Sequence, residues 1–340
     1  MAALVATVTV GYDLMAAVLV GVIIAIGLFI RTQVKAPVIH RRLTGQETRS
    51  VRQRSPEQAE ALARDGNRIV LYELRGALFF AKVDQLFEDM LPDLDRPAWV
   101  ILHLRRVVQI DLTAIKLLGQ IAARLKAHGG ELLFCEVHGA LGIGERIERT
   151  LRGLSLARAP SALQTFNGSD EALEYAENAL LTQREMLLVT PLDRIRLSDM
   201  HLCCGMTAAE QADLMTVLRQ RTLTAGERFF AAGDSGDELY IVLQGEIEVR
   251  LPTSLHHYKR LAIYGPGALF GDVAFLDPGP RTADGIATQD SELLALDPVG
   301  FDQLQARNPV AAIALLRAIG RYQSRALRWS SQEIHRLAQW

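Results

Sequence analysis

The sequence predicts a multi-domain protein with an N-terminal transmembrane helix, an α/β domain, and an α+β β-roll with flanking helices. Three observations lead to this prediction. An uncharged apolar run is followed by a basic stretch, short apolar runs then alternate with helical patterns, and short strands separated by glycines follow from about residue 192. A chain of 340 residues has room for two soluble domains of ordinary size and one smaller element.

The N-terminal segment 1–30 has the pattern of a membrane span. Asp13 is its one charged side chain, and the uncharged run 14–30 is close to the length that crosses a bilayer as a helix. The residues that follow are rich in Lys and Arg, so the positive-inside rule puts residues 31–340 in the cytoplasm. A cleaved signal peptide would carry its basic residues before the apolar run. A buried helix of a soluble domain is the alternative interpretation.

Residues 31–66 are predicted to form a basic juxtamembrane linker that ends in a short helix. Ser55 is a typical helix cap, Pro56 suits the first turn, and Gln58 completes a capping box. The next apolar runs are short enough for strands, and helical periodicity separates them. This alternation predicts an α/β layer with strands at 69–74, 99–104 and 132–137 and helices near 83–90, 115–125, 143–154 and 171–181.

The pattern changes after about Leu192. A helix near 208–219 is followed by short strands between many glycines, which is typical of a small β-roll or barrel. Two helices, near 298–306 and 310–326, are expected to end this domain, and residues 327–340 are expected to be a short polar tail.

Composition excludes several classes of function. The net charge of -2 gives no general affinity for nucleic acid. Cys135, Cys203 and Cys204 are too few for a disulfide framework and lack zinc-ligand spacing, so we expect reduced, buried thiols. No nucleophile elbow, phosphate-binding Walker loop or metal-ligand cluster is visible, so we expect no catalytic residues, no metal and no enzyme.

The stretch 265–284 has the chemistry of a phosphate site. Gly271 permits close approach of the backbone, and a short helical turn from Asp272 to Leu276 would direct free N–H groups at an anion. Arg281 can give a bidentate, charge-assisted contact to a phosphate.

This stretch resembles the phosphate-binding cassette of cyclic-nucleotide-binding domains, and the resemblance extends over residues 192–326. It also includes the runs 224–227, 232–234 and 239–245. The resemblance implies a fold and a ligand, cAMP or cGMP. The site residues that it implies are Phe270, Gly271, Asp272, Val273, Arg281, Thr282 and Ala283.

Two acidic residues depart from a simple phosphate site. Asp272 stands where ligand-binding members of the family carry a Glu for the ribose 2′-hydroxyl, and Asp284 adds a negative charge that would lower affinity unless it points away. The alternative is that Arg281 pairs with Asp272 or Asp284 and the pocket binds no nucleotide.

Residues 67–185 resemble a STAS domain, the module shared by sulfate-permease-type transporters and bacterial anti-sigma-factor antagonists. In the antagonists, the residue after the Asp of the motif Asp111-Leu112-Thr113 is a phosphorylated Ser. Leu112 cannot accept a phosphate, which leaves Thr113 as the candidate phosphorylation site. Helix capping alone also explains Asp111 and Thr113.

The order of the parts resembles the C-terminal end of a bacterial SulP-type anion transporter, with 11–14, 21–25 and 28–31 matching its last membrane segment. The expected function is the cytoplasmic regulatory region of such a sulfate- or bicarbonate-type transporter at the bacterial inner membrane, present without most of the transport domain. Expected partners are the membrane, a transporter core or a homo-oligomer, with a cyclic nucleotide and no nucleic acid. The alternative is a stand-alone membrane-anchored signalling protein that senses a cyclic nucleotide or acts through STAS partner switching. A transcription factor is disfavoured, because residues 327–340 are too few for a helix-turn-helix.

Overall fold

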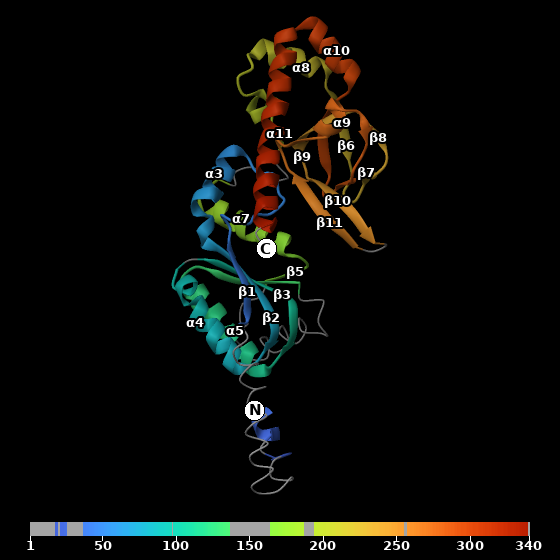
Figure 1. The fold of residues 1–340 in the computed structure, drawn as a ribbon. Coiled ribbons are helices and arrows are strands. Elements are labelled where there is room, and N and C mark those ends of the chain that lie inside the picture. The colour runs from blue at the N-terminus through green and yellow to red at the C-terminus, as the bar shows by residue number, and fades with distance from the viewer. Residues whose placement is uncertain are drawn as a thin grey trace. The chain divides into compact units, whose positions relative to one another are not determined.

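The computed structural model describes residues 18–19, 21–25, 37–96, 98–136, 164–186, 194–254 and 257–338. The chain divides into two compact units, whose elements are drawn in Figure 1. The first unit comprises residues 1–45 and 67–173, and the second comprises residues 46–66 and 174–340.

Within the described ranges, no helix combines the length and the apolar character that a membrane crossing requires. The predicted membrane segment 1–30 lies outside the described residues, except for 18–19 and 21–25, which are helical. The expected helix at 143–154 also lies outside them.

The first unit is built on one sheet in the order β1-β2-β3-β4-β5, in which β1 is antiparallel to β2 and the other neighbours are parallel. Apolar side chains of the central strands and of helices α4 and α5 form its core. The predicted α/β layer is therefore present. Its elements are β1 Ile39–Thr44, β2 Ile69–Leu78, α4 Phe80–Leu94, β3 Trp99–Ile110, α5 Leu112–Ala127, β4 Glu131–Cys135 and β5 Gln164–Phe166. Helix α7, Ser169–Gln183, begins in the first unit and lies mostly in the second, which resumes at residue 174.

Strands β2 and β3 are longer than the apolar runs that predicted them. Their ladder continues to the pair of Leu78 and Ile110, with two register shifts. The second half of β3 is exposed at Arg105 and Arg106, whereas Val107 is buried. Arg105 and Arg106 ended the apolar run in the sequence, but they do not interrupt the backbone pairing.

The β-roll of the second unit contains two four-stranded sheets, β11-β10-β14-β7 and β12-β9-β15-β6, and a short pair, β13-β8. Aromatic and aliphatic side chains fill the space inside the roll. The strands are β6 Arg219–Leu223, β7 Arg228–Phe230, β8 Ser235–Gly236, β9 Leu239–Gln244, β10 Ile247–Ser254, β11 His257–Tyr264, β12 Leu269–Phe270, β13 Gly279–Pro280, β14 Asp284–Ala287 and β15 Ser291–Leu296.

Helices pack against one side of the roll and form a second apolar cluster with it. They are α8 Ala208–Val217, α10 Pro298–Arg307 and α11 Pro309–Ala338, with α9 Asp272–Leu276 inside the roll sequence and turns at Leu197–Asp199 and His201–Cys203. Helix α11 continues through most of residues 327–340, where we expected a tail, because neither Pro nor Gly interrupts that stretch.

The segment 46–66 belongs to the second unit rather than serving only as a linker. Its helix α3, Pro56–Asp65, has the predicted capping box at Ser55 and Gln58. Just before it, Arg52 forms a parallel bridge with Ile263 of β11, and the Gln53 N–H donates to the Ile263 carbonyl at 2.9 Å. This segment therefore covers the edge strand of the four-stranded sheet that ends in β11.

An ion cluster fixes this contact. Nη1 of Arg52 lies 2.6 Å from both Glu174 and Glu246, and Nη2 of Arg260 lies 2.6 Å from the second oxygen of Glu174. Arg54 pairs with Glu177 at 2.8 Å beside it. The basic residues that predicted a membrane-facing linker thus include two that pair with acids inside this unit.

Candidate functional site

Arg281 is held in place by its own backbone and by a glycine. Its N–H donates to the Asp234 carbonyl at 2.7 Å, and its carbonyl accepts from the Gly233 N–H at 2.8 Å. The side chain passes directly over Gly236, where a Cβ atom would collide with the guanidinium. The short pair of strands β8 and β13 therefore sets both the position and the direction of Arg281.

The guanidinium of Arg281 is buried beside two aromatic rings. Only 9% of the residue is exposed, and the guanidinium carbon lies 4.8 Å from the ring centre of Phe230 and 5.6 Å from that of Tyr240. Its hydrogen bond to the Glu238 carbonyl is long, at 3.4 Å, and in the described part of the chain no carboxylate pairs with it. Buried charges are normally paired, so this site can accept an anion such as a phosphate.

Asp284 does not pair with Arg281. Its Oδ1 accepts from the Ala232 N–H at 2.8 Å, and Asp284 continues into β14 opposite Arg250. The carboxylate is therefore committed to the loop before β8. The structure therefore differs from the alternative in which Asp284 neutralises Arg281.

Asp272 is buried, and a side-chain hydrogen bond links it to Gln323 of helix α11. Burial raises the pKa of the Asp272 carboxyl, although hydrogen bonds from Gln323 and from the local backbone oppose the shift. The negative charge also acts on Tyr264 and Tyr322, whose pKa values are raised first by burial. Asp272 thus connects the cassette to α11 in this structure.

The other predicted cassette residues have distinct places. Gly271 has φ +81°, a left-handed conformation, and begins α9, which matches the predicted helical turn. Phe270 is buried and stacks on Tyr240 and Tyr264, with ring centres 5.2 and 5.1 Å away. Ala283 is buried, whereas the side chains of Val273 and Thr282 are exposed.

Sequence reasoning missed the aromatic residues that hold Arg281. Phe230 and Tyr240 lie in strands β7 and β9, far from the cassette in sequence. The run 239–245, which includes Tyr240, was assigned to the early strands and turns of the roll, and Phe230 was not singled out. An aromatic residue at the end of a short strand gives no local signal that its ring will face a cation.

In the first unit, Asp111 caps helix α5, and its Oδ1 accepts from the Ala114 N–H at 2.6 Å. Leu112 and Thr113 are exposed in the first turn. The capping prediction for Asp111 is confirmed, and Thr113 is accessible as a hydroxyl; its phosphorylation stays a prediction.

The cysteines differ in exposure. Burial raises the pKa of the Cys203 thiol to about 11 and that of the Cys135 thiol still further, whereas Cys204 is exposed. The prediction of buried thiols is therefore wrong for Cys204, because its neighbour takes the inward position in the turn. In the described ranges, no three His, Cys, Asp or Glu side chains gather as a metal site.

Comparisons with known families identify two domains in this chain. Residues 60–172 match the STAS domain, and residues 220–308 match the cyclic nucleotide-binding domain. A STAS domain and a cyclic nucleotide-binding domain are therefore present, and this pair is typical of a regulatory protein.

Two curated relatives show the range of proteins that share these parts. "Glutaminase 2" of Bradyrhizobium diazoefficiens is 26% identical over 82% of this chain and 43% of its own length. The "Cyclic AMP receptor protein" of Thermus thermophilus is 37% identical over 34% of this chain and 53% of its own length. The chain thus spans about half the length of the curated relatives that it matches.

Among solved structures, the N-terminal domain of a transcriptional regulator from Streptomyces coelicolor A3(2) is 32% identical, with a TM-score of 0.35. It covers 38% of this chain and 90% of its own. The expectation of no enzymatic activity is left open by the glutaminase relatives, although the two matched domains are regulatory.

Proposed function

We propose that this chain is a regulatory module that binds a cyclic mononucleotide, cAMP or cGMP, in its β-roll. The observation that carries the proposal is the buried guanidinium of Arg281, which lies between two aromatic rings and has no carboxylate partner in the described residues. A cyclic phosphate diester has one negative charge and two free oxygens, which suits the two parallel donors of an arginine.

The surroundings of Arg281 complete the proposed phosphate site. Gly271 is close to it, since a Cβ built on this glycine would lie 3.3 Å from Nη1 of Arg281. An oxyanion bound to the guanidinium would therefore lie beside the cassette backbone, next to the ring of Tyr240. Phe270, Val273, Thr282 and Ala283 are proposed to surround the rest of the nucleotide.

Asp272 has a more particular role in this proposal. Because Gln323 holds its side chain, a ribose 2′-hydroxyl must compete with α11 for the carboxylate. Binding of a nucleotide would then change the contact between α9 and α11. Regulation requires such a contact to differ between the free and bound states.

The proposed setting is a larger protein in which these domains control another activity. In the "Glutaminase 2" relative, more than half of the length lies outside the match, and we propose that the matched part is the regulatory one.

The SulP-type transporter setting remains a second proposal, with the uncharged run 14–30 and the STAS domain in its favour. Sedimentation separates these settings, since a transporter remnant would need detergent to leave the membrane pellet. Glutamine hydrolysis by the purified chain would overturn the expectation of no enzyme.

Thermal unfolding of the full chain tests nucleotide binding. We expect cAMP or cGMP at saturating concentration to raise the unfolding temperature, because a ligand that binds only the folded state stabilises it by mass action. Linear 5′-AMP and 5′-GMP serve as controls for the shape of the phosphate. If neither cyclic nucleotide shifts the transition in the wild type, the proposal is wrong.

A further inference from the structure

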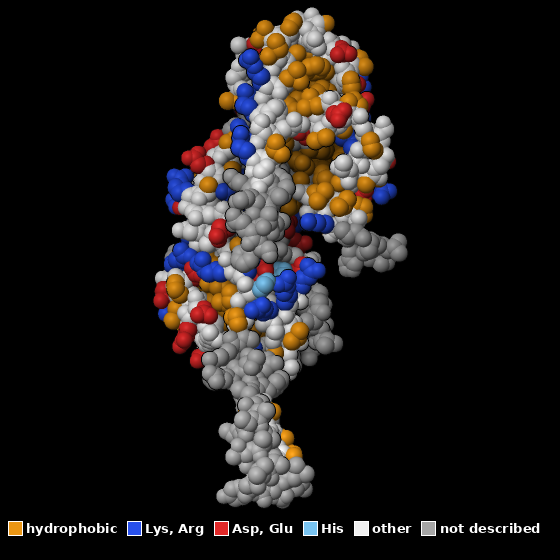
Figure 2. All heavy atoms as spheres, viewed as in Figure 1, with side chains coloured by type: hydrophobic (Ala, Val, Ile, Leu, Met, Phe, Trp, Pro, Cys, Tyr) orange, Lys and Arg blue, Asp and Glu red, His pale blue; other side chains and the backbone are white. Residues whose placement is uncertain are grey.

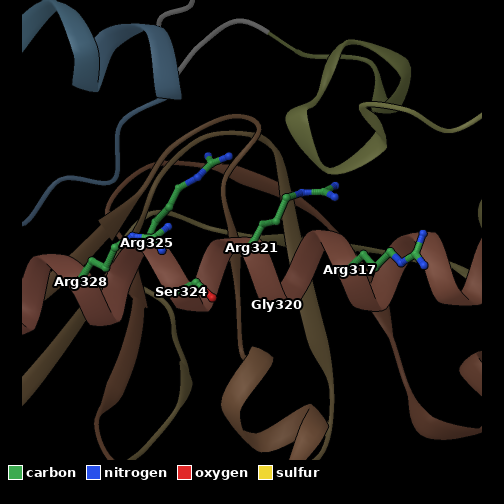
Figure 3. A pocket seen from close by; sticks show the side chains of 6 residues that line it. All are labelled: Arg317, Gly320, Arg321, Ser324, Arg325 and Arg328. Atoms are coloured by element: carbon green, nitrogen blue, oxygen red, sulfur yellow. The ribbon is translucent and has the colours of Figure 1, made fainter.

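Helix α11 carries a row of arginines on its solvent side. Arg317, Arg321, Arg325 and Arg328 are all exposed, and they line a hollow of about 550 Å³ together with Gly320 and Ser324. Figure 3 shows the four side chains projecting from the helix around these two small residues. Figure 2 shows Lys and Arg side chains in a row along α11. We call these six residues the arginine face.

The spacing of the four arginines follows one side of a helix. At about 100° and 1.5 Å per residue, they fall within about 80° of each other and span about 16 Å along the axis. The opposite side of α11, which includes Leu315 and Ile319, is buried in the core of the unit. The arginine face is therefore held on a rigid, packed element.

The row itself contains no acidic residue. Glu333 is the one acidic residue in the sequence of α11, and in the described part of the chain none of the four arginines pairs with a carboxylate. Four like charges on neighbouring turns repel each other, which costs stability unless a partner uses them. The charge of this face thus calls for an anionic partner.

Apolar residues flank the arginines. Ile313, Leu316 and Leu327 are exposed by 50%, 39% and 69%, on the side of the row where Gly320 and Ser324 lie. No described atom outside the helix's own backbone lies within 4 Å of a Cβ position on Gly320, so the described residues leave the space above it open. Small residues between exposed apolar ones permit the backbone of another helix to approach closely.

We propose that the arginine face docks an acidic amphipathic helix of a partner protein. Glutamates or aspartates at matching turns would pair with the arginines, and apolar residues beside them would contact Ile313, Leu316 and Leu327. A nucleic acid would contact the arginines but would leave the apolar residues beside them exposed. A flat membrane surface would not use the hollow over Gly320 and Ser324. A second copy of α11, laid along the first, would bring arginines against arginines.

Binding of a synthetic helix to the full chain tests this proposal. The probe is a labelled peptide of about 20 residues, long enough to form a helix, with Glu spaced as the arginines are and Leu on the adjacent side. A peptide of the same composition in scrambled order is its control. We expect fluorescence anisotropy to report saturable binding of the patterned peptide, weakened by salt, and at least tenfold weaker binding of the scrambled one.

The variant Arg321→Glu/Arg325→Glu should weaken binding about tenfold or more and should bind a Lys version of the peptide instead. The matched control, Lys116→Glu/Lys126→Glu, makes the same change of net charge on the exposed side of α5 and should bind as the wild type does. Equal loss in both variants would show an effect of net charge alone and overturn the proposal.

Other partners are outcomes of the same assay. If a short DNA duplex or phosphatidylglycerol vesicles bind more tightly than the patterned peptide and lose binding in Arg321→Glu/Arg325→Glu, the face serves that partner and the helix proposal is wrong. A dimer of the wild type that this variant dissociates would identify a second copy as the occupant. If the wild type is folded, as its helical content shows, and the patterned peptide still does not bind to it, the helix proposal is also overturned.

Discussion

The second unit buries arginines in two different ways. Arg52 lies 2.6 Å from both Glu174 and Glu246, whereas Arg281 lies between two aromatic rings with no carboxylate partner in the described residues. Both side chains are largely shielded from water. The difference teaches that burial of a charge does not by itself identify a binding site. A paired arginine holds two chain segments together, while one without a counter-ion leaves an anion to be supplied from outside.

The direction of the pKa shift of Arg52 agrees with this difference between a paired and an unpaired arginine. Burial lowers its pKa, but the charges of Glu246 and Glu174 outweigh that effect, and the net result is a raised pKa. The ionised form is therefore favoured by its neighbours at every pH at which those carboxylates are ionised. Removal of either partner would leave a shielded charge unpaired.

The largest effect is expected for Arg52→Ala. The free energy of unfolding should fall by about 3 kcal/mol, because Glu174 and Glu246 lose the cation that joins them. Urea denaturation of the full chain measures this loss. Arg64→Ala, in the exposed last turn of α3, is the matched control and should change stability by less than about 0.5 kcal/mol. A loss below about 1 kcal/mol in Arg52→Ala would contradict a structural role for the cluster.

For Arg281→Ala we expect a large loss of nucleotide affinity and a small loss of stability. Nucleotide affinity should fall about 100-fold, because one bidentate contact to the phosphate is lost. The free energy of unfolding should fall by only about 1 kcal/mol, since the guanidinium makes one long hydrogen bond and two aromatic contacts. Calorimetry measures the first effect and urea denaturation the second. A loss of stability as large as that of Arg52→Ala would remove the contrast between the two arginines.

Asp272→Asn should be more stable than the wild type at neutral pH, because burial penalises the charged carboxylate. The pKa of the Asp272 carboxyl is raised in the folded state, so folding favours the protonated form. The wild type should therefore lose stability relative to the variant as pH rises from near 3.8, the ordinary pKa, through the raised folded value. Urea denaturation from pH 3 to 8 checks this. A difference that stays constant with pH would contradict the buried, titrating carboxyl.

The smallest effect is expected for Asp284→Asn. The amide oxygen can keep the hydrogen bond from the Ala232 N–H, so the loop before β8 should be preserved. Because this side chain is committed to that loop, loss of its charge should change nucleotide affinity by less than about threefold. Calorimetry at low and high salt measures the nucleotide affinity of the variant and of the wild type. A tenfold gain in affinity would show that Asp284 acts on the phosphate directly.

Local patterns predicted the local structure well. The cap at Asp111, the capping box at Ser55, and the left-handed Gly271 that starts α9 follow from residue types within a few positions of each other. The order of an α/β domain and a β-roll could also be predicted, because the period of the apolar residues changes where the domains change. The candidate site was found from Arg281 and the glycine before α9 in the same stretch.

Contacts between distant residues could not be predicted in this way. The sequence gives no sign that Arg52 will meet Glu174 and Glu246, so a basic segment suggested a membrane surface instead. Likewise, nothing near Asp272 indicates that its carboxyl will bond to Gln323 rather than face a ribose. A side chain's partner is set by the packing of whole elements, and the local pattern records only that the side chain is polar.

A double-mutant cycle between protein and ligand tests the central claim most directly. Calorimetry compares the favoured cyclic nucleotide with its uncharged alkyl phosphate triester, for the wild type and for Arg281→Ala. If Arg281 supplies the charge that binds the phosphate, the wild type should prefer the charged ligand by about 100-fold, and Arg281→Ala should bind both ligands with nearly equal affinity. Undiminished preference for the charged ligand in Arg281→Ala would contradict the assignment of this arginine as the phosphate-binding residue.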